Sequence, residues 1–99
     1  RIMIEADSWT IIDNLVAYQD DTAFSLLKRC AEENGFSIES TYYAEFDSTF
    51  IDSINGTVSG TDGKYWQYSV NGELPTIGAD KYIVTNGDTI RWSFEAIPM

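Results

Sequence analysis

One stretch of the sequence decides the fold: residues 20–35 read DDTAFSLLKRCAEENG. Its apolar residues form a single stripe with the 3.6-residue period of an α-helix. The members of this stripe are Ala23, Phe24, Leu27, Cys30 and Ala31. Acceptor groups on Asp20, Asp21 and Thr22 can cap the first turn, and Gly35 can take the left-handed conformation that ends a helix. We therefore predict one helix, the only one expected in the chain, over residues 22–34.

The stripe also predicts which helix side chains face a sheet. Phe24 and Leu27 lie on it, and replacing either with alanine in a packed core costs about 2–5 kcal/mol. Cys30 lies on it as well, and its only basic neighbour is Arg29. We therefore expect a buried thiol rather than a nucleophile.

Extended segments flank the helix on both sides. Before it, residues 1–6 alternate along the chain and place Ile2, Ile4 and Ala6 on one face. Residues 9–18 favour two short strands or one bent strand. After the helix, strands are predicted over the ranges 36–43, 50–54, 57–58, 64–70, 81–85 and 89–95.

Asn-Gly pairs mark three turns between these strands, at 55–56, 71–72 and 86–87. Both residue types tolerate the positive φ angles that tight hairpin turns require. The third pair lies between two segments of strand-forming residues, 81–85 and 89–95. We therefore predict a terminal β-hairpin from these two segments.

One helix among many strands predicts the α+β class, as a β-grasp-like mixed sheet with the helix over residues 22–34 packed on one face. The 99 residues suit a single domain, 1–99. The chain begins with Arg1 rather than Met. We therefore expect a domain excised from a longer secreted or surface protein, whose signal peptide this fragment does not carry.

The composition excludes several classes of function. Six Lys and Arg against sixteen Asp and Glu give a net charge of −10, so nucleic acid and anionic membrane surfaces would repel the chain. No apolar run approaches the roughly 20 residues that cross a bilayer. With no His and one Cys, the chain cannot assemble a Ser-His-Asp or Cys-His unit, or the usual zinc ligands. We predict a protein that is not an enzyme and needs no cofactor.

The sixteen carboxylates leave a cation site open as an alternative. They are spread along the chain, and no calcium-loop motif is present. Oxygen ligands could still converge from the loop at 45–52. Residues 55–57, Asn-Gly-Thr, match a glycosylation acceptor, although a turn explains the same residues.

Aromatic side chains exceed what one thin core needs. Four have the inward period of their strands and are expected in the core: Trp66, Tyr68, Trp92 and Phe94. A second group is expected to be partly exposed: Tyr42, Tyr43, Phe46, Phe50 and Tyr65. Together with Leu74, Pro75 and Ile77, these could form an apolar patch that contacts a ligand or a protein. Ordinary partial burial is the alternative.

Several short motifs resemble a known family. They are Tyr65-Trp66-Gln67, Asn71-Gly72, GADKY at 78–82 and NGDTI at 86–90, with DTAFSLL at 21–27 and SING at 53–56 upstream. These motifs resemble the C-terminal β-domain of the vitamin B12 carriers transcobalamin and intrinsic factor. The chain looks still more similar to the bacterial and archaeal surface-protein domains of unknown function grouped with them.

The resemblance implies a β-grasp-like domain that closes over one face of a corrinoid, while a separate helical domain holds the rest. It implies that Phe50, Tyr68, Leu74 and Pro75 face the ligand. We therefore expect a non-catalytic, extracellular ligand-binding module with a corrinoid-like ligand, completed by a second domain of the same protein. Two alternatives stay open: a protein- or glycan-interaction module of a cell-surface protein, and an acidic cation-binding domain.

Overall fold

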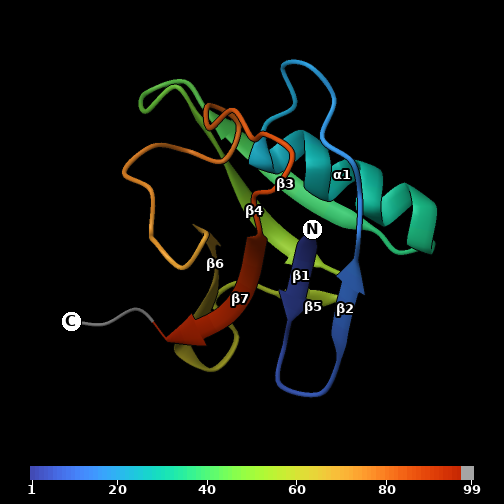
Figure 1. Cartoon of the computed structure of the whole chain (residues 1–99). Helices are drawn as coiled ribbons and strands as arrows, with labels where there is room; N and C mark the ends of the chain where they lie inside the picture. Colours follow the sequence, from blue (N-terminus) through green and yellow to red (C-terminus); the bar gives the residue numbers. More distant parts are fainter. Residues whose placement is uncertain (97–99) are drawn as a thin grey trace.

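The computed structural model describes residues 1–96, which form one α-helix and seven β-strands (Figure 1). The elements are β1 (Ile2–Glu5), β2 (Thr10–Asp13), α1 (Ala23–Asn34), β3 (Ile38–Tyr43), β4 (Ser48–Ile54), β5 (Thr57–Val58), a short 3₁₀ turn (Thr61–Gly63), β6 (Lys64–Val70) and β7 (Ile90–Ala96). The strands form a four-stranded sheet in the order β2-β1-β7-β6 and a three-stranded sheet in the order β3-β4-β5. The predicted α+β class is confirmed, and the strands divide into two sheets where one was expected.

The four-stranded sheet is mixed, because β1 pairs antiparallel with β2 and parallel with β7. On the other side β7 pairs antiparallel with β6. Ile2, Ile4 and Ile90 are fully buried in the core that this sheet shares with α1. The predicted alternation of the first strand is therefore confirmed. Residues 9–18 yield only the short strand β2, followed by an irregular connection to the helix.

Helix α1 begins and ends where the sequence predicts. Thr22 is the N-cap: its side chain accepts a hydrogen bond from the Ser25 backbone N–H, and Ser25 Oγ accepts one from the Thr22 N–H. Gly35 closes the helix at φ 74°. Leu27 and Cys30 are buried as expected, whereas Phe24 is only half-buried and Leu26 joins the core in addition. Within residues 1–96, no helix has the length and apolar character that crossing a membrane requires.

The predicted terminal hairpin is wrong. Residues 81–85 do not pair with the last strand, because β7 already has β1 on one side and β6 on the other. The segment instead lies along the entry to α1, where Ala23 N–H donates to the Tyr82 carbonyl and Val84 N–H donates to the Asp21 carbonyl. Two of its backbone groups are thus satisfied by the helix entry. Alternation of apolar and polar residues predicts a strand with one buried face, but it does not identify the strand that pairs with it.

The two other Asn-Gly turns are confirmed. Asn55 and Gly56 have φ angles of 50° and 81° and connect β4 to β5. Asn71 and Gly72 have φ angles of 52° and 86°, and the Val70 and Glu73 backbones pair across them. The second turn directs the chain from β6 into the long connection 71–89, which forms one wall of the site described below.

Candidate ligand-binding groove

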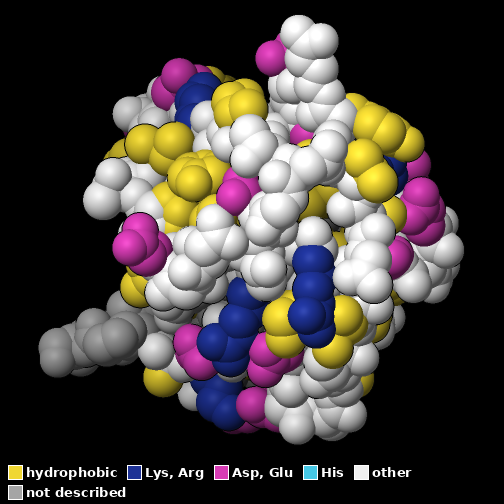
Figure 2. Space-filling model, in the orientation of Figure 1, with side chains coloured by type: hydrophobic (Ala, Val, Ile, Leu, Met, Phe, Trp, Pro, Cys, Tyr) yellow, Lys and Arg dark blue, Asp and Glu magenta, His cyan; other side chains and the backbone are white. Residues whose placement is uncertain are grey.

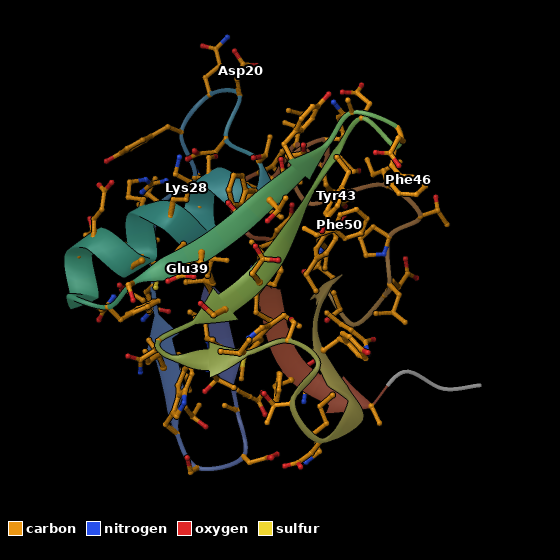
Figure 3. The ribbon with its side chains drawn as sticks, turned by 180° about the vertical axis from the view of Figure 1, so that it is seen from behind. Asp20, Lys28, Glu39, Tyr43, Phe46 and Phe50 are labelled. Carbon is orange, nitrogen blue, oxygen red and sulfur yellow. The ribbon has the colours of Figure 1, made fainter. Side chains whose placement is uncertain are left out.

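Three aromatic rings cluster at the tip of the β3–β4 ribbon. Tyr43, Phe46 and Phe50 contact one another edge to face, with ring centroids 5.3–6.5 Å apart. Their exposed fractions are 39%, 66% and 50%. Figure 3 shows all three side chains on one side of the ribbon. The expectation that some aromatics outside the core are exposed is confirmed.

Local sequence explains this cluster. Tyr43 lies opposite Ser48 in the β3–β4 register, so Phe50, two residues further along β4, is its diagonal neighbour on the same face. The intervening turn is fixed by Asp47, which accepts a hydrogen bond from the Tyr42 hydroxyl at 2.6 Å and pairs with Lys81 at 3.1 Å. These two hydrogen bonds hold the pKa of Asp47 below its usual range. The ion pair also ties the ribbon tip to the connection 71–89.

The cluster opens into a groove with two parts, which share Phe50, Ile51, Trp66 and Gln67. The outer part has a volume of about 560 Å³ and lies among the aromatic cluster, Tyr65 and Ser59. The inner part has a volume of about 340 Å³ and lies between β4, β6 and residues 75–79 of the connection. Figure 2 shows hydrophobic side chains gathered on the molecular surface where this connection runs, at the upper left.

Tyr68 belongs both to the core and to the groove. Its ring stacks on Trp92 with centroids 5.4 Å apart, and its hydroxyl donates a hydrogen bond to the Ile77 carbonyl. Burial raises the pKa of Tyr68 to about 12, and the nearby Asp80 carboxylate acts in the same direction. The hydroxyl therefore stays protonated and fastens the connection to β6. The inward period of Tyr68 and its expected role at the ligand surface are compatible, because the ring forms part of the groove floor.

The four residues expected to face a ligand lie on one side of the molecule but are not equivalent. Phe50, Tyr68 and Pro75 line the inner part of the groove. Leu74 precedes Pro75 on the connection, is 69% exposed and does not line the groove. Binding by all four residues thus stays a prediction, and for Leu74 it requires a ligand that extends beyond the groove.

Sequence reasoning missed part of the lining. Trp66 was assigned to the core and is 8% exposed, yet it contributes to both parts of the groove. Ile51 has no sequence signal and Gln67 appears only within the Tyr-Trp-Gln motif, although both residues line both parts of the groove. The Tyr-Trp-Gln motif was the available signal. The groove lies between two sheets, so period-2 patterning within either one could not reveal it.

Two buried polar atoms in this region have no hydrogen-bond partner: the indole Nε1 of Trp92 and Oδ1 of Asp80. Trp92 lines the inner part of the groove. Asp80 adjoins it, and its second oxygen accepts a hydrogen bond from the Thr49 backbone N–H at 3.2 Å. A buried donor and a buried acceptor without partners are uncommon in native proteins and are often satisfied by water or a ligand.

Gly78 lies on the connection close to Ser48 of β4. A Cβ at this position would lie 2.5 Å from Ser48 Oγ and 2.8 Å from Asp80 Oδ1. We expect Gly78→Ala to lower the free energy of unfolding by about 1–3 kcal/mol, because the side chains of Ser48 and Asp80 must move to relieve the overlap. Urea unfolding measures this loss. Thr76→Ala, at an exposed position of the same connection, is the control and should change stability by less than about 0.5 kcal/mol. Equal losses in the two variants would contradict the prediction.

The acidic loop does not form a cation cage in this structure. Among residues 1–96, no group of three or more His, Cys, Asp or Glu side chains is arranged to hold a metal ion. Two carboxylates of the loop 45–52 are engaged otherwise: Asp47 pairs with Lys81, and Asp52 accepts a hydrogen bond from Thr41. These contacts explain why the carboxylates of this loop do not converge.

The α+β fold of this chain is similar to that of a transcobalamin-family protein, haptocorrin. A family model described as "Domain of unknown function (DUF4430)" matches residues 20–96, and the chain belongs to that family. No curated protein matches the sequence significantly.

Two solved structures are similar over nearly the whole chain. The first is haptocorrin in complex with Cbi, with a TM-score of 0.72 and 23% identity over 97% of this chain. This chain spans only 25% of the length of that haptocorrin chain. The second is described as "a putative metal binding protein from Ruminococcus gnavus", with a TM-score of 0.63 and 16% identity, covering 98% of this chain and 95% of that one. At these identities the likeness establishes the fold.

Proposed function

We propose that this chain is a non-catalytic ligand-binding module of an extracellular protein, and that its ligand is a corrinoid. The observation that carries the proposal is the groove itself: Phe50, Tyr68 and Pro75 come from three separate segments and line one open, largely apolar surface. Large apolar rings beside a few polar groups are typical of small-molecule sites.

The chemistry of a corrinoid suits this surface. A corrin is a broad macrocycle with apolar edges and amide substituents, so it offers both a face for aromatic packing and groups for hydrogen bonding. The side-chain amide of Gln67, which lines both parts of the groove, can donate to an amide carbonyl and accept from an amide N–H. The similar fold in haptocorrin in complex with Cbi supports the same ligand class.

The groove is open on its outer side, where Phe46 and Phe50 are at least half exposed. A large ligand bound here would keep part of its surface in water. We therefore propose that a second domain of the same protein covers the ligand from the other side. The small share of the haptocorrin chain that this domain spans supports such an arrangement.

Corrinoid titration tests this proposal. Trp66 and Trp92 both line the groove, so cobinamide and cobalamin should change tryptophan fluorescence in a saturable way. A ligand present at 100 times its dissociation constant should add about 2.7 kcal/mol to the free energy of unfolding. Phe50→Ala should weaken cobinamide binding by about tenfold. The matched control is Ile12→Ala, because Ile12 is 51% exposed, against 50% for Phe50, and lies on β2.

The outcomes of the titration distinguish the proposal from its rivals. If neither corrinoid changes fluorescence or melting temperature, the corrinoid assignment is wrong. The exposed cluster of Tyr43, Phe46 and Phe50 then favours an interaction module for proteins or glycans at a cell surface. A parallel titration with Ca²⁺ tests the cation alternative, for which a saturable rise in melting temperature would count.

A further inference from the structure

The strand β3 is an edge strand with one free side. Within residues 1–96 it pairs only with β4, and its six residues are exposed apart from the half-buried Ile38. A free edge presents unpaired backbone N–H and C=O groups that another strand can pair with. Proteins often block such edges with Lys or Pro, but β3 contains neither and has one irregularity, at Glu39/Ser40.

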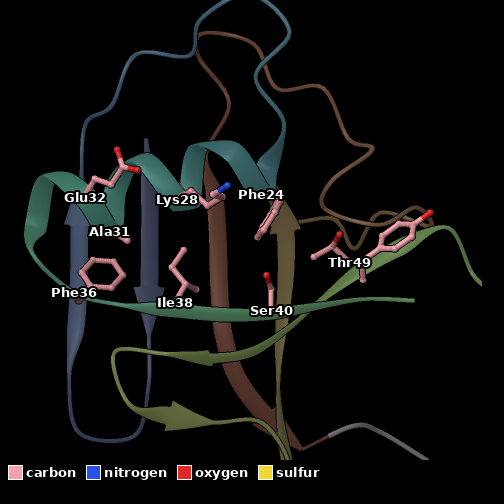
Figure 4. A pocket seen from close by; sticks show the side chains of 9 residues that line it. Phe24, Lys28, Ala31, Glu32, Phe36, Ile38, Ser40 and Thr49 are labelled. Carbon is pink, nitrogen blue, oxygen red and sulfur yellow. The ribbon is translucent and has the colours of Figure 1, made fainter. Parts of the chain in front are cut away.

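A second groove runs beside this edge, distinct from the aromatic one. It has a volume of about 460 Å³ and lies between α1 and the inner face of β3. Phe24, Lys28 and Ala31 line it from the helix, and Ile38 and Ser40 line it from the strand. Figure 4 shows the helix side chains above and the strand side chains below, with the groove between them. Phe24 is therefore half-buried because it is a wall of this groove.

The two faces of β3 carry different chemistry. Ile38 and Ser40 point into the groove, so the intervening Glu39 and the following Thr41 belong to the opposite face. Thr41 donates a hydrogen bond to Asp52, which places that carboxylate on the same face as Glu39. None of the ion pairs among residues 1–96 involves Glu39 or Asp52. One face of the edge thus adjoins a groove in which apolar side chains lie beside Lys28 and Glu32, and the other face is acidic.

We propose that the free edge of β3 binds an extended segment of another protein by β-strand addition, and that this segment alternates apolar and basic residues. Backbone hydrogen bonds to the strand edge supply affinity in this mode, and alternate side chains supply specificity. Apolar side chains of the added strand enter the groove beside α1. Its basic side chains meet Glu39 and Asp52 on the other face.

The net charge of the chain favours a basic segment over a second copy of the chain as the added strand. Each copy carries a net charge of −10, so edge-to-edge pairing of two copies would bring like charges together. A basic segment is instead attracted to the same surface. This inference does not rest on the corrinoid proposal, because the free edge of β3 and the groove beside α1 carry it, although Asp52 also lines the outer part of the aromatic groove.

The test uses the intact chain and a blocked eight-residue peptide of alternating lysine and valine. In the free protein, amides of β3 that point to the free edge should exchange with solvent rapidly, and their neighbours paired with β4 slowly. Saturating peptide should slow exchange of the fast amides at least about tenfold. Amide chemical shifts should change in residues 36–43 and in the facing part of α1.

Control peptides and variants test each part of the proposal. A peptide of alternating glutamate and valine, and one with four lysines followed by four valines, should not produce the protection. Glu39→Lys should weaken binding about threefold, and Glu33→Lys, on the exposed side of α1, should weaken it less. Ser40→Pro or Thr41→Pro should abolish binding. The variant to use is the one whose amide exchanges fast in the free protein, because proline then removes an N–H from the free edge.

Four results would overturn the inference: unchanged exchange in β3, shifts confined to the groove around Phe50 and Tyr68, equal binding of the control peptides, or protection that rises with protein concentration alone. The last result would identify a second copy as the occupant.

Discussion

Replacing Leu27 with alanine should lower the free energy of unfolding by about 2–5 kcal/mol. Leu27 is fully buried and belongs to the core cluster shared by α1 and the four-stranded sheet. The loss has two parts, because the removed methyl groups no longer leave water on folding and the remaining cavity collapses only in part. Urea unfolding of the wild-type protein and Leu27→Ala measures this loss directly, provided that the free energy of unfolding depends on urea concentration with the same slope in both.

Phe24→Ala is the matched variant for this prediction. Both residues lie on the apolar stripe of α1, but Phe24 is half-buried and lines the groove beside β3. We therefore expect a clearly smaller loss for Phe24→Ala than for Leu27→Ala. A change below about 0.5 kcal/mol in both variants would contradict the packing of α1 on the sheet.

Replacing Asp21 with asparagine should have the second large effect. The Asp21 carboxylate accepts hydrogen bonds from the Tyr18 backbone N–H and the Ser25 hydroxyl, and it pairs with Arg29. Arg29 also lies over the Tyr18 ring, 4.2 Å from its centroid. The carboxylate thus joins the connection 14–22 to the helix. Losing these charge-assisted hydrogen bonds should cost about 1–3 kcal/mol at pH 7.

The pH dependence of stability provides a second measurement on Asp21. Burial alone would raise the pKa of Asp21, but the hydrogen bonds from Tyr18, Ser25 and Arg29 outweigh burial and lower it. A carboxyl group whose pKa is lower in the folded state stabilises the fold above its unfolded pKa, which is about 3.9 for Asp. This stabilisation is lost as the pH falls through the folded pKa. Below about pH 4, the wild-type protein should therefore lose stability more steeply than Asp21→Asn.

Asp20→Asn is the control for Asp21→Asn. Asp20 is exposed and projects from the tip of the connection (Figure 3). Its φ angle is 65°, a conformation that asparagine also tolerates. We expect this variant to change the free energy of unfolding by less than about 0.5 kcal/mol at pH 7. Below about pH 4 it should lose stability as steeply as the wild-type protein. If the two variants behave alike, the proposed role of the Asp21 contacts is wrong.

The local features of the chain could be predicted because they depend on nearby residues. Thr22 and Gly35 bound the helix through capping and a left-handed turn, which involve backbone groups only a few positions away. The Asn55-Gly56 turn likewise requires only two residues that accept positive φ. The burial of Cys30 follows from its place on the helical stripe, and burial, with the negative charge of Asp13 as a second cause, raises the pKa of its thiol to about 11.

The pairing of distant segments could not be predicted in the same way. The final strand has β1 as a parallel neighbour, although 84 residues separate Glu5 from Ile90 in the chain. Residues 81–85 have the composition of a strand, yet their backbone bonds to the start of α1. Hydrophobic alternation is the same for any partner that buries the same face. The choice depends on the combined packing of all elements.

The candidate site shows the same division. Composition and resemblance directed attention to Phe50, Tyr68, Leu74 and Pro75, and they also indicated that aromatic rings exceed the needs of the core. Only the tertiary structure separates Leu74 from the other three, and only it reveals that Trp66 lines the groove. The sequence by itself determined the helix, its caps, two tight turns and the α+β class, because the forces behind them act over a few residues. The tertiary structure decided which strands pair and where the grooves open, because those depend on surfaces that meet only after the chain has folded.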